Sequence, residues 1–226
     1  MLHSIQQRYG ETLRATDGEI GHVRDFYFDD TNWIVRYLVA DTGGWLSGRL
    51  VLISPHALGH LYPEGRVFLV NLTRQQIEDS PSIDEHKPVS RQHEEEYHQY
   101  YGYAYYAESM PLWGLGGYPV LVPPPMEADA KQPGADSHLR SARVVAGYNV
   151  EASDGVVGEV VDFLIDARTW AMREIVVECG HWYAGKKVVI STEKVSRIGH
   201  DHSTVYVDST KHAFAEASEQ PLSTPA

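Results

Sequence analysis

The sequence predicts an all-β protein made of two small antiparallel β-barrels, each with a short C-terminal helix, joined by a connector rich in tyrosine and proline. Three observations lead to this prediction: an internal repeat, short apolar segments bounded by turn residues, and a change of composition between the two copies. The predicted bounds are residues 1–80 for the first barrel, 81–140 for the connector, 141–218 for the second barrel and 219–226 for a disordered tail.

The internal repeat is the strongest of these observations. Shifting the sequence by 137 residues aligns residues 17–54 with residues 154–191 without a gap, and about sixteen of the thirty-eight positions are identical. Such a match indicates a duplicated domain. Each copy spans about 75 to 80 residues, a size that is only marginally stable alone. Two similar barrels can pack about a pseudo-two-fold axis, as a homodimer does.

Each copy opens with a predicted β-hairpin. Gly18 and Gly155 follow an aspartate in a two-residue turn, because Asp and Gly tolerate the positive φ that such turns need. A second hairpin follows, with its loop at residues 29–32 in the first copy and 166–169 in the second. Its predicted register sets an acid opposite an arginine and so predicts two cross-strand ion pairs, Asp25 with Arg36 and Asp162 with Arg173.

A third strand follows a Trp-x-x-Gly turn in each copy. It covers residues 49–53 in the first copy and 186–190 in the second. We expect the glycines that end these turns, Gly48 and Gly185, to be structural residues.

A fourth strand and a short helix complete each copy. The strand covers residues 67–70 and 205–207. Thr73 with Gln76 three residues later is a capping-box pattern, which predicts a helix after Thr73. Short strands at close spacing with one terminal helix are typical of a small antiparallel barrel.

The connector differs in composition from both copies. It holds eight of the 12 prolines and seven of the 14 tyrosines. We expect residues 90–106, which hold most of these tyrosines, to pack on a barrel or on a partner, and the proline-rich remainder to be extended and mobile.

Charge and cysteine content argue against several classes of function. The 19 Lys and Arg residues against 31 Asp and Glu give a net charge of -12, which disfavours nucleic acid as a partner. The single cysteine, Cys179, cannot form an internal disulfide and fits a reducing cytoplasm. We expect no signal peptide and no direct membrane insertion, so any association with a membrane complex would run through a protein partner.

Two motifs carry a family resemblance. The pattern D-G-x-x-G-x-V-x-D-F occurs at residues 17–26 and 154–163, and W-x-x-R occurs at residues 33–36 and 170–173. In these residues each copy resembles the PRC-barrel domain, which the photosynthetic reaction-centre H subunit and the ribosome maturation factor RimM share. The tandem arrangement is similar to that of bacterial members with two copies. The resemblance implies a protein-interaction module without chemistry of its own, and it is compatible with a membrane or photosynthetic-type complex or with a stress response.

Four short patterns resemble catalytic, metal-binding or phosphate-binding motifs, but their spacing or sequence context argues against such sites. The histidines of residues 93–98 are five positions apart, about 140° around a helix, so they cannot share one metal-binding face. Residues 191–194 match S-x-x-K, but the first copy lacks the lysine, which favours a strand-end turn. Residues 114–117 lack the context of a phosphate loop, and residues 200–202 are favoured as a polar turn. We therefore predict no catalytic residue, no cofactor, no metal site and no enzyme activity.

Two functions from different classes remain. The first is a non-enzymatic adaptor or assembly factor that docks a protein partner, and a homodimer is also compatible with the sequence. The alternative is a small-molecule or pigment-binding protein with an aromatic-lined pocket between barrels and connector. Because aromatic side chains dominate interface energetics, the candidate partner-binding residues are Trp33, Trp45, Tyr97, Tyr100, Tyr101, Tyr103, Trp170 and Trp182. For the four tryptophans, the simpler interpretation is a structural role in the barrels, and a partner-binding surface is the alternative.

Overall fold

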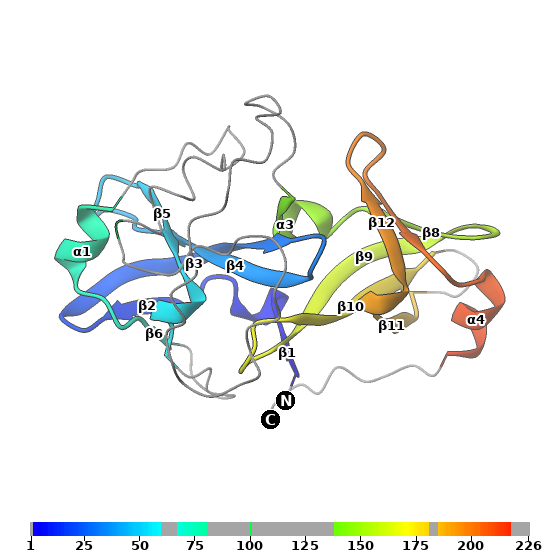
Figure 1. Cartoon of the computed structure of the whole chain (residues 1–226), viewed down its shortest axis with the longest axis horizontal. Helices are drawn as coiled ribbons and strands as arrows, with labels where there is room; N and C mark the ends of the chain where they lie inside the picture. Colours follow the sequence, from blue (N-terminus) through cyan, green and yellow to red (C-terminus); the bar gives the residue numbers. More distant parts are fainter. Residues whose placement is uncertain (1, 60–66, 81–99, 101–137, 181–184, 218–226) are drawn as a thin grey trace, which may run out of the picture.

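The protein folds into two β-sheets with a similar order of elements (Figure 1). The computed structural model describes residues 2–59, 67–80, 100, 138–180 and 185–217. The first half contains β2 (Thr12–Ala15), β3 (Gly18–Asp29), β4 (Ile34–Asp41), β5 (Leu50–Ile53), η2 (Pro55–Ala57), β6 (Val67–Leu69) and α1 (Arg74–Glu78). The second half contains β8 (Asn149–Ala152), β9 (Gly155–Asp166), β10 (Met172–Cys179), β11 (Lys187–Ser191), η4 (Thr192–Lys194), β12 (Val195–Gly199), β13 (Thr204–Val207) and α4 (Lys211–Glu216).

Neither sheet closes into a barrel, so the predicted pair of closed antiparallel barrels is wrong in this respect. The strand orders are β5-β4-β3-β2-β6 and β11-β10-β9-β8-β13-β12. The pairs β2–β6 and β8–β13 are parallel, and the other strand pairs are antiparallel. The edge of β3 that extends beyond β2 is occupied by β7 (Leu139–Ser141), which precedes the second half in sequence. The backbone groups at that edge of β3 are therefore paired with the segment that precedes the second half, and the first sheet does not close on itself.

The second hairpin of each half forms, but not in the predicted register. Asp25 lies opposite Val39 and Asp162 lies opposite Val176, so the predicted pairs Asp25–Arg36 and Asp162–Arg173 are wrong. β-Bulges in both hairpins shift the pairing, and the tryptophan before each returning strand has a left-handed backbone, with φ of 54° at Trp33 and 58° at Trp170. Arg36 instead lies 3.7 Å from Asp29, and Arg173 is exposed.

The two halves share one hydrophobic core. Its buried aromatic residues come from both sheets, and the rings of Phe28 and Phe163 lie 5.7 Å apart. At the junction, Val35 N–H donates to Trp170 C=O at 2.9 Å and Met172 N–H donates to Trp33 C=O at 2.7 Å. These two hydrogen bonds are equivalent under the 137-residue shift, so a pseudo-two-fold axis passes between the two strand pairs, as in the homodimer-like packing that we considered.

Each terminal helix is tied to the first turn of its own half. Thr73 and Gln76 form the predicted capping box at the start of α1. In addition, Asp17 Oδ1 accepts a hydrogen bond from Arg74 N–H at 2.8 Å, and Asp154 Oδ1 accepts one from Lys211 N–H at the same distance. The turn aspartates therefore satisfy backbone donors that each helix start would otherwise leave unpaired.

Four glycines hold equivalent positions in the two halves. Gly48 and Gly185 both have φ of 76°, in the left-handed region that favours glycine, as the Trp-x-x-Gly turns predict. Gly21 and Gly158 lie where β3 and β9 cross the neighbouring strand: a Cβ at Gly158 would overlap the carbonyl oxygen of Glu178, and one at Gly21 would overlap that of Asp41. The close backbone contact requires the absence of a side chain.

The variant Gly158→Ala is expected to lower the free energy of unfolding by about 2 kcal/mol or more, because backbone atoms must move apart. Gly44→Ala is the matched control, since a Cβ there meets nothing within 4 Å and the residue is exposed. Urea denaturation of both variants measures the difference. Equal stability of the two variants would contradict the close packing of β9 on β10.

Candidate functional site

The junction between the halves is built by two exchanged arms. The first arm is β1 (Leu2–Ser4) followed by η1 (Gln6–Arg8), and β1 pairs with β9 of the second half. The second arm is β7 followed by α3 (Ala142–Val145), and β7 pairs with β3 of the first half. In Figure 1, β1 and α3 lie between the two sheets. Each arm precedes one half in sequence and completes the sheet of the other.

A buried carboxylate holds each arm in place. Ser141 Oγ donates to Asp25 Oδ2 at 2.5 Å, and Arg143 N–H donates to Asp25 Oδ1 at 3.1 Å. Ser4 Oγ donates to Asp162 Oδ2 at 2.5 Å, and Gln6 N–H donates to Asp162 Oδ1 at 2.9 Å. Asp25 and Asp162, predicted as ion-pair partners of arginines, therefore bind the arm of the opposite half.

Burial opposes ionisation at both aspartates. Desolvation raises the pKa of the Asp25 carboxyl above its ordinary value, although hydrogen bonds from Ser141 and two backbone N–H groups act in the other direction. The pKa of Asp162 is raised for the same reason, against the hydrogen bonds from Ser4 and the backbone. The two sites are thus alike in geometry and in electrostatics.

The first sheet has an apolar surface on the side away from the shared core. Residues directly opposite one another on neighbouring strands share a face. By this register Tyr37 shares its face with Tyr27, and Val39 shares its face with Leu52. Their cluster is separate from the shared core. We call this surface the first outer face, and it comprises Tyr27, Tyr37, Val39, Leu50, Leu52 and Leu139.

The second sheet carries the equivalent surface with two charged replacements. The 137-residue shift matches Tyr37 with Glu174 and Leu50 with Lys187. Lys187 lies opposite Glu178 on the neighbouring strand, and the side chains of both are 43% exposed. We call this surface the second outer face, and it comprises Leu2, Leu164, Glu174, Val176, Lys187 and Val189.

Neither outer face was predicted from the sequence, although the strand patterns contain a signal for the first one. Residues 49–53 read R-L-V-L-I, with apolar side chains at every position after the arginine, whereas residues 186–190 read K-K-V-V-I. A continuous apolar run is typical of a strand that is buried on both faces. β5 is buried at all four of its positions, and β11 alternates between buried and half-buried residues.

Two of the predicted partner-binding tryptophans, Trp33 and Trp170, lie at the junction, and Trp45 lies against α1. Trp170 is buried in the shared core at 8% exposure, which fits a structural role, and its role in binding a partner stays a prediction. Trp33 is half-buried and stacks on Phe28 with ring centroids 5.4 Å apart. Trp45 is half-buried beneath the guanidinium group of Arg74, 4.5 Å from its ring centroid.

The predicted tyrosines lie in the connector. Tyr100 is exposed, and its hydroxyl donates to the carbonyl oxygen of Gln76 at 3.1 Å. The other four predicted aromatic residues lie outside the described residues: Tyr97, Tyr101, Tyr103 and Trp182.

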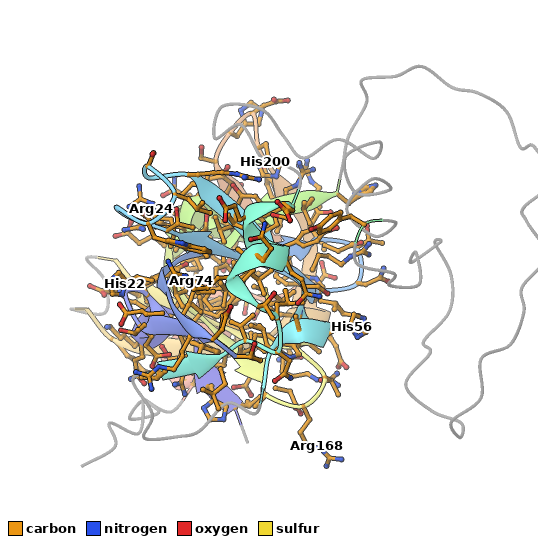
Figure 2. The ribbon with its side chains drawn as sticks, turned by 90° about the vertical axis from the view of Figure 1, so that its left-hand side faces the viewer. His22, Arg24, His56, Arg74, Arg168 and His200 are labelled. Atoms are coloured by element: carbon orange, nitrogen blue, oxygen red, sulfur yellow. The ribbon has the colours of Figure 1, made fainter. Side chains whose placement is uncertain are left out.

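The chemical patterns take structural roles where the structure describes them. Ser54 and Ser191 cap the short helices η2 and η4, as expected of strand-end turns. Residues 200–203 connect β12 with β13, and His200 Nδ1 lies 3.0 Å from the Tyr148 hydroxyl. Figure 2 shows His22, His56 and His200 on different sides of the molecule. Within the described ranges, no group of three or more His, Cys, Asp or Glu residues could hold a metal ion. Residues 93–98 and 114–117 lie outside those ranges.

The pH dependence of stability tests the buried carboxylates. A carboxyl group whose pKa is higher in the folded state than in the unfolded chain lowers the unfolding free energy at neutral pH, where it is ionised. This destabilisation disappears as the pH falls toward the ordinary pKa of 3.8, because the group becomes protonated. In Asp25→Asn/Asp162→Asn this effect is absent. We therefore expect the unfolding free energy of the natural protein, relative to the variant, to rise between pH 7 and pH 4 in urea titrations. A relative fall would show that the hydrogen bonds outweigh desolvation.

Comparison with known proteins locates one recognised domain. Residues 10–76 match the PRC-barrel domain, and the predicted second PRC-barrel domain is not confirmed by this comparison. The chain is also 34% identical over 110 residues to an uncharacterized protein of Deinococcus radiodurans, a match that covers 42% of this chain and 39% of the relative. The chain thus spans about two fifths of the relative's length. The matched residues run from the start of the first sheet into its closing helix α1.

Proposed function

We propose that the protein is a non-enzymatic adaptor that docks a protein partner on the second outer face. A PRC-barrel domain suggests a role in protein interaction or assembly. The observation that carries the proposal is the chemistry of this face. Leu2, which is 38% exposed, and the half-buried Leu164 and Val189 form an apolar centre, and Glu174 and Lys187 provide charged groups beside it. An apolar centre with a polar border is the usual anatomy of a protein interface.

The duplication supports an adaptor because it presents two related faces with different chemistry on one rigid scaffold. The shared core and the exchanged arms fix the two sheets relative to each other. The first outer face is apolar and closely buried, whereas the second is half-exposed and carries charge. Only the second is therefore accessible to a partner in this conformation.

The cellular location of the protein and the alternative function remain part of what we propose. None of the helices in the described part of the chain has the length and apolarity that crossing a membrane requires. The cytoplasmic location, the link to a membrane complex or stress response, and the small-molecule alternative stay predictions.

Affinity purification from the source cells tests the adaptor. We expect the tagged natural protein to recover a protein partner in stoichiometric amount, and Leu2→Asp/Val189→Asp to recover at least about tenfold less, because charge is introduced into the apolar centre of the face. Val156→Asp is the matched control: Val156 is 54% exposed and lies outside the second outer face.

Three results would contradict the proposal. The first is that the natural protein recovers no partner in stoichiometric amount. The second is that Leu2→Asp/Val189→Asp recovers as much partner as the natural protein. The third is that the control Val156→Asp loses as much partner as Leu2→Asp/Val189→Asp. Mass spectrometry of denatured samples would also reveal a bound small molecule, which would favour the alternative function.

A further inference from the structure

A buried polar cluster holds the inner side of the first arm. His3 lies opposite Ile165 of β9, a residue of the shared core, and is 8% exposed. In η1, the guanidinium group of Arg8 lies 2.9 Å from His3 Nδ1 through Nη2 and 3.0 Å from Glu11 Oε1 through Nη1. The same group lies 6.0 Å from the ring centroid of Phe68 in β6. The cluster therefore joins the first arm to both sheets.

The contact with Arg8 determines the protonation state of His3. The guanidinium group of an arginine offers donors and no acceptor, and it stays charged in proteins. His3 Nδ1 must therefore accept the hydrogen bond, which requires a neutral ring with its proton on Nε2. Protonation of Nδ1 removes this hydrogen bond and places two cationic groups in contact inside a buried cluster. The attached arm thus favours neutral His3.

The electrostatic surroundings of His3 act mostly in the same direction. Burial lowers the pKa of His3 below its ordinary value of 6.5, and the positive charges of Arg8 and of the amino terminus lower it further. The carboxylate of Asp166 opposes them, but it lies at the end of β9, where it accepts hydrogen bonds from the N–H groups of Arg168 and Thr169. Because the pKa is lowered in the folded state, attachment of the arm is stable above pH 6.5 and weakens as the pH falls below it.

The second arm has a different anchor at the equivalent position. The 137-residue shift matches His3 with Arg140. Arg140 Nε donates to Asp30 Oδ2 at 2.7 Å, and this arginine stays charged throughout the pH range in which a histidine titrates. His138 Nδ1 lies 2.9 Å from Asp30 Oδ1, so protonation of His138 favours the attachment of this arm rather than opposing it. Mild acid therefore weakens the anchor of the first arm and not that of the second.

We propose that the contact between His3 and Arg8 is a pH-sensitive latch: protonation of His3 detaches β1 from β9 and so removes Leu2 from the second outer face. Leu2 is the neighbour of His3 in β1, it lies opposite Asp166 of β9, and it belongs to the apolar centre of that face. Partner docking is then strongest at neutral pH and weaker in mildly acidic solution. The latch regulates the proposed docking surface and in that respect rests on the proposed function, whereas detachment of the arm is a property of the purified chain.

Hydrogen exchange of the purified full-length chain at pH 7 and pH 5 tests the latch. The Ile5 amide, which donates to the carbonyl oxygen of Phe163 at 2.9 Å, reports the attachment of the first arm. We expect its protection factor, corrected for the intrinsic exchange rate at each pH, to be at least about threefold lower at pH 5 than at pH 7. His3→Asn is the matched variant, because its side-chain oxygen can accept a hydrogen bond from Arg8 but cannot be protonated in this range. Its Ile5 amide should keep the same protection factor at both pH values.

Two further measurements separate the latch from general effects of acid. The amides of β7, which pairs with β3, report the second arm and should keep their protection in both proteins. Nitrogen NMR of the natural protein at pH 7 should show His3 neutral with its proton on Nε2, a result that does not depend on the folding of the variant. The buried carboxyl groups of Asp25 and Asp162 are present in both proteins, so the difference between the two isolates His3.

Three results would overturn the inference. The first is that protection of the Ile5 amide in the natural protein stays unchanged between pH 7 and pH 5, or falls by the same factor as in His3→Asn. The second is that His3 is charged at pH 7 or carries its proton on Nδ1 when neutral. The third is that β7 loses as much protection as Ile5 in the natural protein. All these measurements use purified protein without a partner, so failure of the latch is distinguishable from failure to capture a partner.

Discussion

The hydrogen bonds between a buried aspartate of one half and a serine of the other are the interactions on which the rest of the structure depends. Burial of a carboxylate costs free energy unless it is hydrogen-bonded, and Asp25 and Asp162 each accept two hydrogen bonds from an exchanged arm besides one from the backbone N–H of the following phenylalanine. Each arm in turn adds buried residues to the shared core, such as Ile5 after β1 and Val145 in α3. The two sheets therefore form one interlocked unit although the sequence contains two similar copies.

The sequence predicted the local structure better than the contacts between halves. The repeat, the hairpin turns, the capping box at Thr73 and the glycine turns are encoded by neighbouring residues, and the structure contains them. The predicted Asp25–Arg36 pair is wrong because bulges and a left-handed Trp33 shift the register, and no local pattern reveals a bulge. The arms were missed because three-residue strands are too short for periodicity, although Ser4 and Ser141 align at the repeat spacing.

The proposed function rests on sequence differences between the outer faces of the two copies. The shared core retains apolar residues in both halves, whereas the outer faces differ where Tyr37 and Leu50 correspond to Glu174 and Lys187. The first outer face stays apolar and is closely buried. A face with added charge can remain open in water and still present an apolar centre to a partner. The duplication thus yields one buried and one accessible surface.

Hydrogen exchange in Ser141→Ala tests most directly whether the arms couple the two halves. Ser141 precedes the second half in sequence, but its hydroxyl serves Asp25 in the first sheet. If the halves are interlocked, the substitution will lower protection by the same factor in the slowest amides of β3 and of β9, because both exchange through one cooperative opening. Loss of protection in one sheet, with the other unchanged, would show two independent domains and contradict the account.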